Sequence, residues 1–169
     1  RGLGDVYKRQ CAISAAALKA GGEAIEPGIT TAEIDKIIYD FIVRHGARPN
    51  FLHLYGFPAT ACISVNDTVI HGIPSRQQQI RPGDIVSIDT GCKIDGFNGD
   101  NACTYACGKI DLEAQRLLDV TKESLHRGIE MARGGNRVGD IGHAVQSYVE
   151  ENGFSVVRSF VGHGVGKEL

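Results

Sequence analysis

Asp89 and Asp100 are the residues of this sequence whose type and spacing first suggest chemistry. They lie in the segment IDTGCKIDGFNGD (88–100), on either side of Asp95-Gly96, a dipeptide typical of two-residue hairpin turns. With that turn, Asp100 faces Gly91, and Asp89 lies on the same face of the hairpin. The two carboxylates are then diagonal neighbours, about 7–8 Å apart at the backbone. Because like charges on one face repel, a divalent cation bound by both carboxylates would be favourable.

Two other interpretations of this stretch remain open. The acids could be solvated side chains on an exposed hairpin face. Alternatively, Asp89-Thr90-Gly91 could act as the Asp-Thr-Gly loop of an aspartic protease, which needs two such loops to place two aspartates on one water. The sequence contains one such loop, so a homodimer would have to supply the second. That interpretation leaves Asp100 without a role.

Two histidines give a second signal, because imidazole binds first-row transition metals readily. His71 lies in IHGIP (70–74), and His163 lies in GHGVG (162–166). The adjoining glycines let backbone or substrate approach closely. Each histidine taken singly is more often structural, so the two are candidates that depend on their neighbours.

The elements that would hold these residues follow from hydrophobic periodicity and turn signals. Thr30 and Glu33 form a capping box, and apolar residues then recur with helical spacing up to Gly46. Further helices are expected over 11–20, 112–132 and 140–151. Strands are expected over 62–65 and 68–71 as one hairpin, over 85–92 and 97–107 as a second, and over 154–161.

Two segments of equal length, 28–46 and 135–153, share one apolar frame. The matched positions are Ile34 and Ile141, Ile38 and Val145, Phe41 and Tyr148, and Ile42 and Val149. Each segment follows another helix and precedes strand-like sequence. The pattern suggests a duplicated unit of two helices followed by strands, with two unrelated amphipathic helices as the alternative.

The composition is that of an ordinary globular domain. The 169 residues are 42% hydrophobic and 22% charged, with a net charge of −2. The sequence therefore has no general basic field for nucleic acid or for an anionic membrane. No apolar run approaches the roughly 20 residues that span a bilayer. Five cysteines without framework spacing indicate reduced thiols in a cytoplasmic protein.

Both ends of the sequence are unusual. Residues 1–10 (RGLGDVYKRQ) show no apolar period and no helix cap, so we expect a non-native or disordered leader before a domain over 11–169. The other end stops just after the glycine-rich GHGVG turn. Because the strands that the repeat predicts do not follow, we expect an incomplete domain.

Four motifs together resemble methionine aminopeptidase of type I, in residues, order and approximate spacing. They are CISVNDTVIHGIP (62–74), RPGDIVSIDTG (81–91), GFNGDNACTY (96–105) and VGHGVG (161–166). The resemblance covers about 11–169. The SVND…HGIP form is similar to the type I enzymes rather than to the type II or proline-directed relatives.

The resemblance implies an α+β pita-bread fold, in which helices flank a curved antiparallel sheet in two pseudo-symmetric halves, the second incomplete here. It also implies a dinuclear centre of two divalent metal ions, with Co, Mn, Fe, Zn and Ni as candidates. Carried over residue by residue, Asp89 would chelate one metal, Asp100 would bridge both, and His163 would bind the other.

The implied activity is metal-dependent removal of the N-terminal methionine from peptides and nascent proteins. His71 would be catalytic, in contact with the substrate near the scissile bond. Phe57 and Cys62 would line the pocket for the methionine side chain, with Phe51 a looser match. The metals would lower the pKa of a bridging water and polarise the peptide carbonyl.

The sequence departs from the family pattern in two places. The family usually has a tyrosine at the position of Leu54, whereas here Tyr55 is adjacent. A second histidine and two glutamates that complete the family's metal site are not found before Leu169. We therefore expect the 169-residue chain to bind metal weakly and to have little or no activity.

The remaining expectations concern partners and alternatives. The resemblance implies a monomer in the cytoplasm, association with the ribosome, no membrane contact and no direct nucleic-acid binding. A non-catalytic pita-bread binding protein and a proline-directed aminopeptidase remain alternatives. The presence of Asp89, Asp100 and His163 together favours the enzyme.

Overall fold

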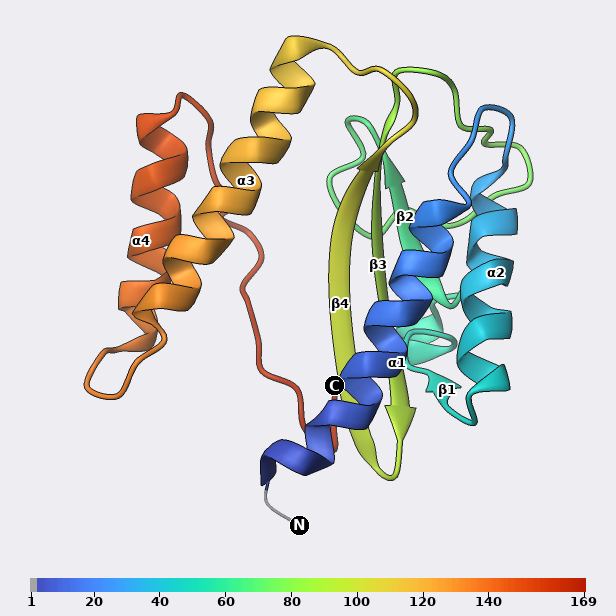
Figure 1. Cartoon of the computed structure of the whole chain (residues 1–169), viewed down its shortest axis with the longest axis horizontal. Coiled ribbons are helices and arrows are strands. Elements are labelled where there is room, and N and C mark those ends of the chain that lie inside the picture. The colour runs from blue at the N-terminus through green and yellow to red at the C-terminus, as the bar shows by residue number, and fades with distance from the viewer. Residues whose placement is uncertain (1–2) are drawn as a thin grey trace. The chain divides into compact units, whose positions relative to one another are not determined.

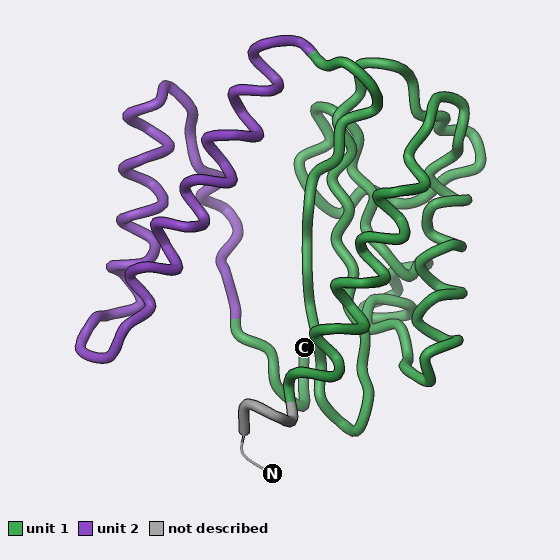
Figure 2. The backbone as a smooth tube through the Cα atoms, in the orientation of Figure 1, with its two compact units in different colours: residues 1–110, 164–169 green, residues 111–163 purple. Residues whose placement is uncertain are grey.

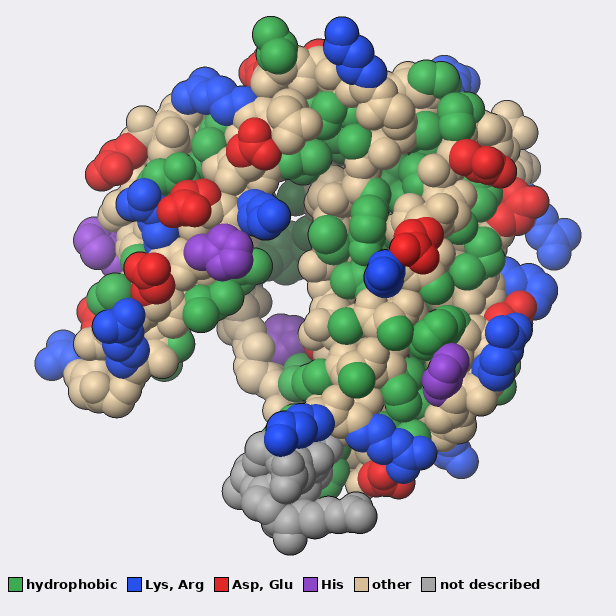
Figure 3. All heavy atoms as spheres, in the orientation of Figure 1, with side chains coloured by type: hydrophobic (Ala, Val, Ile, Leu, Met, Phe, Trp, Pro, Cys, Tyr) green, Lys and Arg blue, Asp and Glu red, His purple; other side chains and the backbone are tan. Residues whose placement is uncertain are grey.

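The computed structural model describes the backbone of residues 3–169 and the side chains of residues 7–169. The chain forms two compact units (Figure 2). The first contains the residues up to Ile110 together with Gly164–Leu169, and the second is Asp111–His163. Acidic and basic side chains are interspersed over the visible face of the molecule (Figure 3). Among the described residues, none of the helices combines the length and apolar character that crossing a membrane requires.

The first helix, α1 (Leu3–Glu23), is longer than the sequence predicts. It includes residues 3–10, where a non-native or disordered leader was expected. In this stretch the Tyr7 ring packs edge-on against Phe97 (ring centroids 5.4 Å apart) and Arg9 pairs with Asp95 (2.9 Å). Residues 1 and 2 lie outside the described part of the chain. The helix also runs through the Gly21-Gly22 pair that was expected to end it.

The second helix, α2 (Thr31–Arg44), begins at the predicted capping box. The backbone N–H of Glu33 donates to the Thr30 hydroxyl (3.2 Å), and the Thr30 N–H donates to the Glu33 carboxylate (2.8 Å). The apolar stripe of α2 is fully buried at Ile34, Ile38 and Ile42. It packs against α1 and against the sheet (Figure 1).

The sheet has four antiparallel strands, β1 (Arg48–Pro49), β2 (Ala61–Val65), β3 (Ile85–Ile94) and β4 (Phe97–Ala106). β3 is central: β4 pairs along one edge, and β1 and β2 pair with successive parts of the other. The predicted Asp95-Gly96 turn joins β3 to β4, and both residues have the positive φ (54° and 84°) that a type I′ turn requires.

The two faces of the sheet have different surroundings. α1 covers one face, where the Ser14 hydroxyl donates to the Thr90 carbonyl (3.2 Å) and where Val86 and Ile88 join the core. Because side chains alternate along a strand, Asp89 and Asp100 belong to the opposite face. The outer helices therefore supply the core, and the other face is left for polar residues.

Two strand predictions are wrong. The segment 68–71 does not form a hairpin with β2, since β2 pairs with β3 and the chain after the Asn66-Asp67 turn is irregular. The segment 154–161 is also irregular rather than a strand. Both segments have the apolar composition of a strand. A strand also requires a neighbouring partner strand, which a local pattern does not specify.

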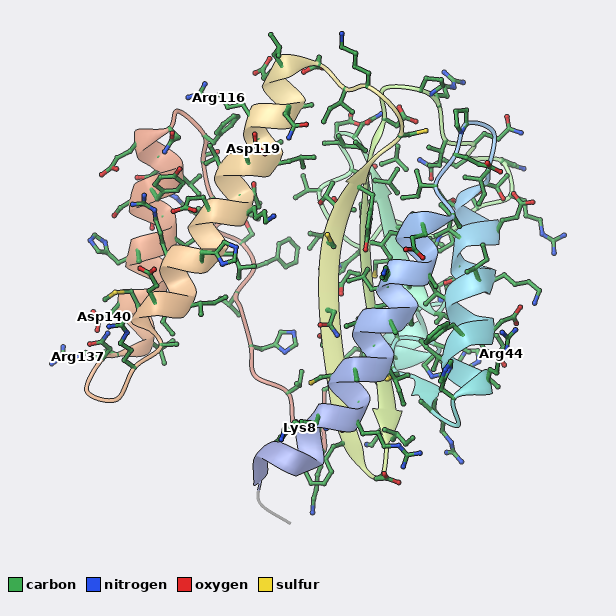
Figure 4. All side chains as sticks on the ribbon, in the orientation of Figure 1. Lys8, Arg44, Arg116, Asp119, Arg137 and Asp140 are labelled. Carbon is green, nitrogen blue, oxygen red and sulfur yellow. The ribbon has the colours of Figure 1, made fainter. Side chains whose placement is uncertain are left out.

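The second unit repeats the helix pair of the first. Its helices, α3 (Leu112–Met131) and α4 (Val138–Glu151), pack on each other, and α4 has 14 residues, as α2 does. Arg137 and Asp140 lie at the start of α4 (Figure 4), where the Arg137 N–H donates to the Asp140 carboxylate (2.7 Å). In α2, the Thr30 N–H donates to the Glu33 carboxylate in the same way.

Gly21 and Gly128 occupy corresponding places in the two helix pairs. A Cβ on Gly21 of α1 would lie 2.7 Å from Ile38 of α2, and a Cβ on Gly128 of α3 would lie 2.9 Å from Val145 of α4. Ile38 and Val145 are matched positions of the predicted repeat. Each helix pair therefore has a glycine that packs closely against a matched residue of the neighbouring helix, which supports the predicted repeat.

Candidate functional site

The β3–β4 hairpin brings Asp89 and Asp100 together as the sequence predicts. Asp100 pairs with Gly91, and Asp89 pairs with Ala102, so both carboxylates lie on the face opposite α1. Both residues are half-buried. Two carboxylates on one face, diagonal to each other, supply the hard oxygen ligands that divalent cations prefer.

Gly91, which lies between the two acids, has a packing role of its own. A Cβ at this position would lie 2.7 Å from the carbonyl oxygen of Gly99 and 3.0 Å from Nδ2 of Asn50. The glycine is therefore explained by close packing within one chain, and the single Asp-Thr-Gly sequence needs no protease loop to account for it.

Asn50 is a residue that the sequence did not indicate. Its backbone N–H donates to the Gly91 carbonyl (3.0 Å), and its side-chain amide donates to the Gly99 carbonyl (3.3 Å). It follows β1 directly and thus links the β1 edge of β3 to β4 at the level of Asp100. Because Asn50 and Gly99 are 49 positions apart in the sequence, no local sequence pattern could have indicated the role of Asn50.

Cys62 faces the carboxylates from β2. It pairs with Asp89, is 6% exposed and lies on the same face. Burial, followed by the charges of Asp89, Asp100 and Asp35, raises the pKa of the Cys62 thiol to about 12. The side chain is therefore a neutral thiol at physiological pH, which suits an apolar wall better than a nucleophile.

His71 and Gly72 are held against the outer edge of β2. The Ile63 N–H donates to the Gly72 carbonyl (2.8 Å), and the Gly72 N–H donates to the Ser64 hydroxyl (3.0 Å). A Cβ on Gly72 would overlap the carbonyl oxygen of Ile63, so only glycine fits. His71 itself has a left-handed backbone (φ 56°), which is uncommon for a residue with a side chain.

The other expected pocket residues lie in the loop before β2. Phe51 is buried and Phe57 is half-buried. Between them, Tyr55 is 98% exposed, whereas Leu54 is half-buried. Tyr55 therefore points to solvent and does not substitute for the tyrosine that the family usually has at position 54.

His163 is the last residue of the second unit, and the residues after it return to the first. The Gly166 carbonyl accepts hydrogen bonds from the Asn98 N–H (2.9 Å) and from Asn98 Nδ2 (3.1 Å), and the Lys167 carbonyl accepts one from Lys93 Nζ (2.7 Å). Asn98 and Lys93 belong to the hairpin that carries the aspartates. The end of the GHGVG motif is thus fixed to that hairpin.

Among the side chains of residues 7–169, no three from His, Cys, Asp or Glu gather as a ready metal site. The donors that the first unit does bring together are the Asp89 and Asp100 carboxylates, and their chemistry fits a divalent cation. An open cavity of about 560 Å³ lies elsewhere, and none of the expected site residues lines it.

The sequence matches the model of metallopeptidase family M24 over residues 5–169. The methionine aminopeptidase of Clostridium perfringens is 49% identical over 98% of this chain and 66% of its own length. Methionine aminopeptidase 1 of Bacillus subtilis is 48% identical over 86% of this chain and 58% of its own length. The chain thus spans about three fifths to two thirds of the length of these relatives.

Solved structures show the same fold. The methionine aminopeptidase of Thermotoga maritima superposes with a TM-score of 0.95 at 35% identity, over 99% of this chain and 68% of that one. The prolidase of Pyrococcus furiosus superposes with a TM-score of 0.85 at 23% identity, over 99% of this chain and 49% of that one. The second likeness is one of fold alone. These neighbours identify the α+β architecture as the pita-bread fold.

Proposed function

The chain belongs to metallopeptidase family M24, and from this premise we propose that the activity its residues serve is removal of the N-terminal methionine from peptides and nascent proteins, with little or no turnover by these 169 residues alone. The observation that carries the proposal is the shared face of Asp89, Asp100 and Cys62 on three adjacent strands. The relatives that are 49% and 48% identical carry the name methionine aminopeptidase, which favours this substrate over others.

Asp89 and Asp100 are the proposed ligands of a divalent metal centre, with His163 as a third. The fixing of Gly166 and Lys167 to the aspartate hairpin supports including the GHGVG motif in the site. We propose two ions, drawn from Co, Mn, Fe, Zn or Ni, because carboxylate and imidazole ligands suit all of these. A bound metal would supply Lewis-acid activation of the peptide carbonyl and of the attacking water.

The chain's own residues would bind and orient the substrate. The neutral thiol of Cys62, with Phe57 and Phe51, forms the proposed pocket for the methionine side chain, since apolar and sulfur-bearing walls suit a thioether. His71, on its left-handed turn beside β2, is the proposed catalytic contact near the scissile bond. The hydrogen bonds of Gly72 to Ile63 and Ser64 fix the backbone next to His71, which supports this role.

The proposed setting follows from the substrate. Nascent chains carry the N-terminal methionine, so the cytoplasm and the ribosome are the proposed location and partner, and the protein is proposed to act as a monomer. Proline-directed cleavage is the second candidate. It is disfavoured because the proline-specific neighbour is similar in fold alone.

The test separates metal binding from turnover. Titration of the metal-free chain with Mn²⁺ or Co²⁺ in a calorimeter measures binding, and chromatography of free methionine measures turnover of a Met-Gly-Met peptide. We expect weak metal binding that requires Asp89 and Asp100, and little or no methionine release by these 169 residues. Any release that is measured should be abolished by EDTA. Release of the first residue from a Gly-Pro peptide instead of a Met-Gly peptide would contradict the proposed specificity.

A further inference from the structure

Asp35 differs from the other charged residues of α2 in its partners. One oxygen of its carboxylate, Oδ1, accepts hydrogen bonds from the backbone N–H groups of Thr60 (2.9 Å) and Ala61 (2.8 Å). By contrast, Asp40 on the same helix pairs with Lys36 at the surface (2.7 Å). Asp35 thus uses its charge to bind the backbone of another element.

The partners of Asp35 stand where β2 begins. One edge of β2 pairs with β3, which leaves the N–H groups of Ala61 and Ile63 directed to the other edge. Ile63 donates to the Gly72 carbonyl (2.8 Å), and Ala61 donates to Asp35. The N–H groups of Ala61 and Ile63 on the outer edge of β2 therefore donate to two separate acceptors, the Asp35 carboxylate on α2 and the Gly72 carbonyl in the HGIP motif.

These hydrogen bonds are part-buried and charge-assisted, and their two donors belong to buried residues. Thr60 is 1% exposed and Ala61 is fully buried, so water has poor access to their N–H groups when the carboxylate is removed. Hydrogen bonds from backbone N–H groups to a carboxylate are stronger than those between neutral groups, and a buried donor without an acceptor is unfavourable. Removing the carboxylate would therefore leave the N–H groups of Thr60 and Ala61 without their acceptor and detach the start of β2 from α2.

We infer that Asp35 is a positioning residue for the proposed methionine pocket, because it fixes the start of β2 so that Cys62 faces Asp89. The inference rests on the proposed function for the identity of the pocket. The pocket residues concerned are Phe57 and Cys62. They precede and follow the two residues, Thr60 and Ala61, whose N–H groups bind Asp35. Asp35 therefore acts through the backbone, without itself contacting the substrate.

The negative charge of Asp35 acts on Cys62, which agrees with a position of Asp35 beside the proposed pocket. Its charge is one of the causes, after burial and after Asp89 and Asp100, that raise the pKa of Cys62. Burial also raises the pKa of Asp35 itself, and the two backbone hydrogen bonds act against that rise.

The test measures the exposure of Cys62 in the variants Asp35→Ala and Asp35→Asn. Each protein is treated with N-ethylmaleimide at pH 7, and labelling of each cysteine is followed by peptide mass spectrometry. For Asp35→Ala we expect Cys62 to be labelled about tenfold faster, since a local opening raises the reactive population. Cys92 and Cys107, which are buried elsewhere, should keep their rates.

The conservative variant distinguishes the hydrogen bonds from the charge. Asp35→Asn keeps an acceptor oxygen, so Cys62 should stay within about threefold of its wild-type labelling rate. The matched control is Asp40→Ala, which removes an aspartate from the same helix without touching β2. An unchanged Cys62 rate in Asp35→Ala, or equal acceleration of all three buried thiols, would overturn the inference.

Hydrogen exchange keeps the test decisive if Asp35→Ala fails to fold. In Asp35→Asn, a neutral acceptor replaces a carboxylate, so the amides of Thr60 and Ala61 should exchange faster than in the wild type. The amides of α2 should not change. Exchange at Thr60 and Ala61 that matches an Asp40→Asn control would show that Asp35 does not hold this segment.

One further arm separates this inference from the proposed function. Free L-methionine is added during labelling of the wild-type chain, and it should protect Cys62 if the pocket is as proposed. A lack of protection would count against the pocket, whereas the effect of Asp35→Ala on Cys62 exposure would still stand. Protection that Asp35→Ala abolishes would support both.

Discussion

Gly91 lies directly opposite Asp100 across the β3–β4 ladder, and a Cβ on Gly91 would lie 3.0 Å from the side-chain amide nitrogen of Asn50 and 2.7 Å from the Gly99 carbonyl oxygen. A side chain from outside the hairpin thus packs close to the position between the two proposed metal ligands. This arrangement ties the β1 edge of the sheet to the strand that carries Asp100.

Gly91→Ala should destabilise the protein by about 1–3 kcal/mol, because the added methyl group overpacks a site without free space. Urea unfolding followed by circular dichroism measures the change. Gly134→Ala is the matched control, since nothing lies within 4 Å of a Cβ there. Equal effects of the two substitutions would contradict the close packing at Gly91.

Asp89→Asn and Asp100→Asn should each lower the affinity for Mn²⁺ by more than about tenfold, because each removes an anionic ligand. Without metal, the same variants should be as stable as the wild type or slightly more so, because a like-charge repulsion is relieved. Calorimetric titration measures the first effect and thermal unfolding the second.

The control for these variants is Asp95→Asn in the turn of the same hairpin. Asp95 is exposed and pairs with Arg9 (2.9 Å), and asparagine suits its left-handed backbone. Mn²⁺ binding should not change in this variant. A wild-type affinity in both Asp89→Asn and Asp100→Asn would remove the hairpin from the metal site.

The loop before β2 contains two residues in left-handed conformations, His53 (φ 70°) and Tyr55 (φ 47°). Such a conformation costs about 1–2 kcal/mol for a residue with a side chain, and glycine avoids most of that cost. His53→Gly and Tyr55→Gly should therefore raise the midpoint of thermal unfolding. Leu54→Gly, at a half-buried neighbour, should lower it, and a fall for all three would argue against backbone strain.

Stability should decline at alkaline pH. Burial, followed by Cys11, raises the pKa of Cys92 to about 11, and burial, followed by Cys103 and Glu23, raises the pKa of Tyr105 to about 12. The folded chain therefore holds these protons to a higher pH than the unfolded chain does. The stabilisation is complete below the ordinary pKa values of these groups and is lost as pH rises through 11 and 12.

The measurement is the free energy of unfolding between pH 8 and pH 12 for the wild type and for Cys92→Ala and Tyr105→Phe. Neither variant can ionise at the substituted position, so each should show a shallower decline than the wild type. The decline should not vanish, because burial also raises the pKa of Cys107. Parallel curves for all three proteins would show that these groups do not cause the decline.

The repeated glycines predict paired effects in the two units. Gly21→Ala and Gly128→Ala should each destabilise by about 1–3 kcal/mol, because the new methyl group meets Ile38 or Val145. Ile38→Val and Val145→Ala should partly rescue the respective variants. A double-mutant cycle measures the rescue, and additive effects would mean that the helices do not touch there.

Local signals in the sequence were sufficient for the elements with strong periodicity. The capping box at Thr30, the helical stripe of α2 and the Asp95-Gly96 turn were predicted and are present in the structure. The parity of that turn also placed Asp89 and Asp100 on one face. Each of these features depends on residues within one element or one hairpin, so the physical cause lies within the segment itself.

Other features depend on contacts between segments far apart in sequence. The apolar segment 68–71 has the composition of a strand, yet β2 pairs with β3, because the long central strand offers a longer ladder than the turn at Asn66 does. The N-terminal part of α1 contacts the β3–β4 hairpin, where Tyr7 packs against Phe97 and Arg9 pairs with Asp95. Neither the partner strand of β2 nor the start of α1 could be predicted from a local sequence pattern.

The sequence by itself determined the helix pairs, the central hairpin and the face that carries Asp89 and Asp100, because the periods of helix and strand are local properties. Only the tertiary structure decided that Asn50 packs against Gly91 and that Asp35 holds the start of β2 opposite the hairpin. Those contacts join residues that are 49 and 26 positions apart. They exist because buried donors must find acceptors wherever the packed chain provides them.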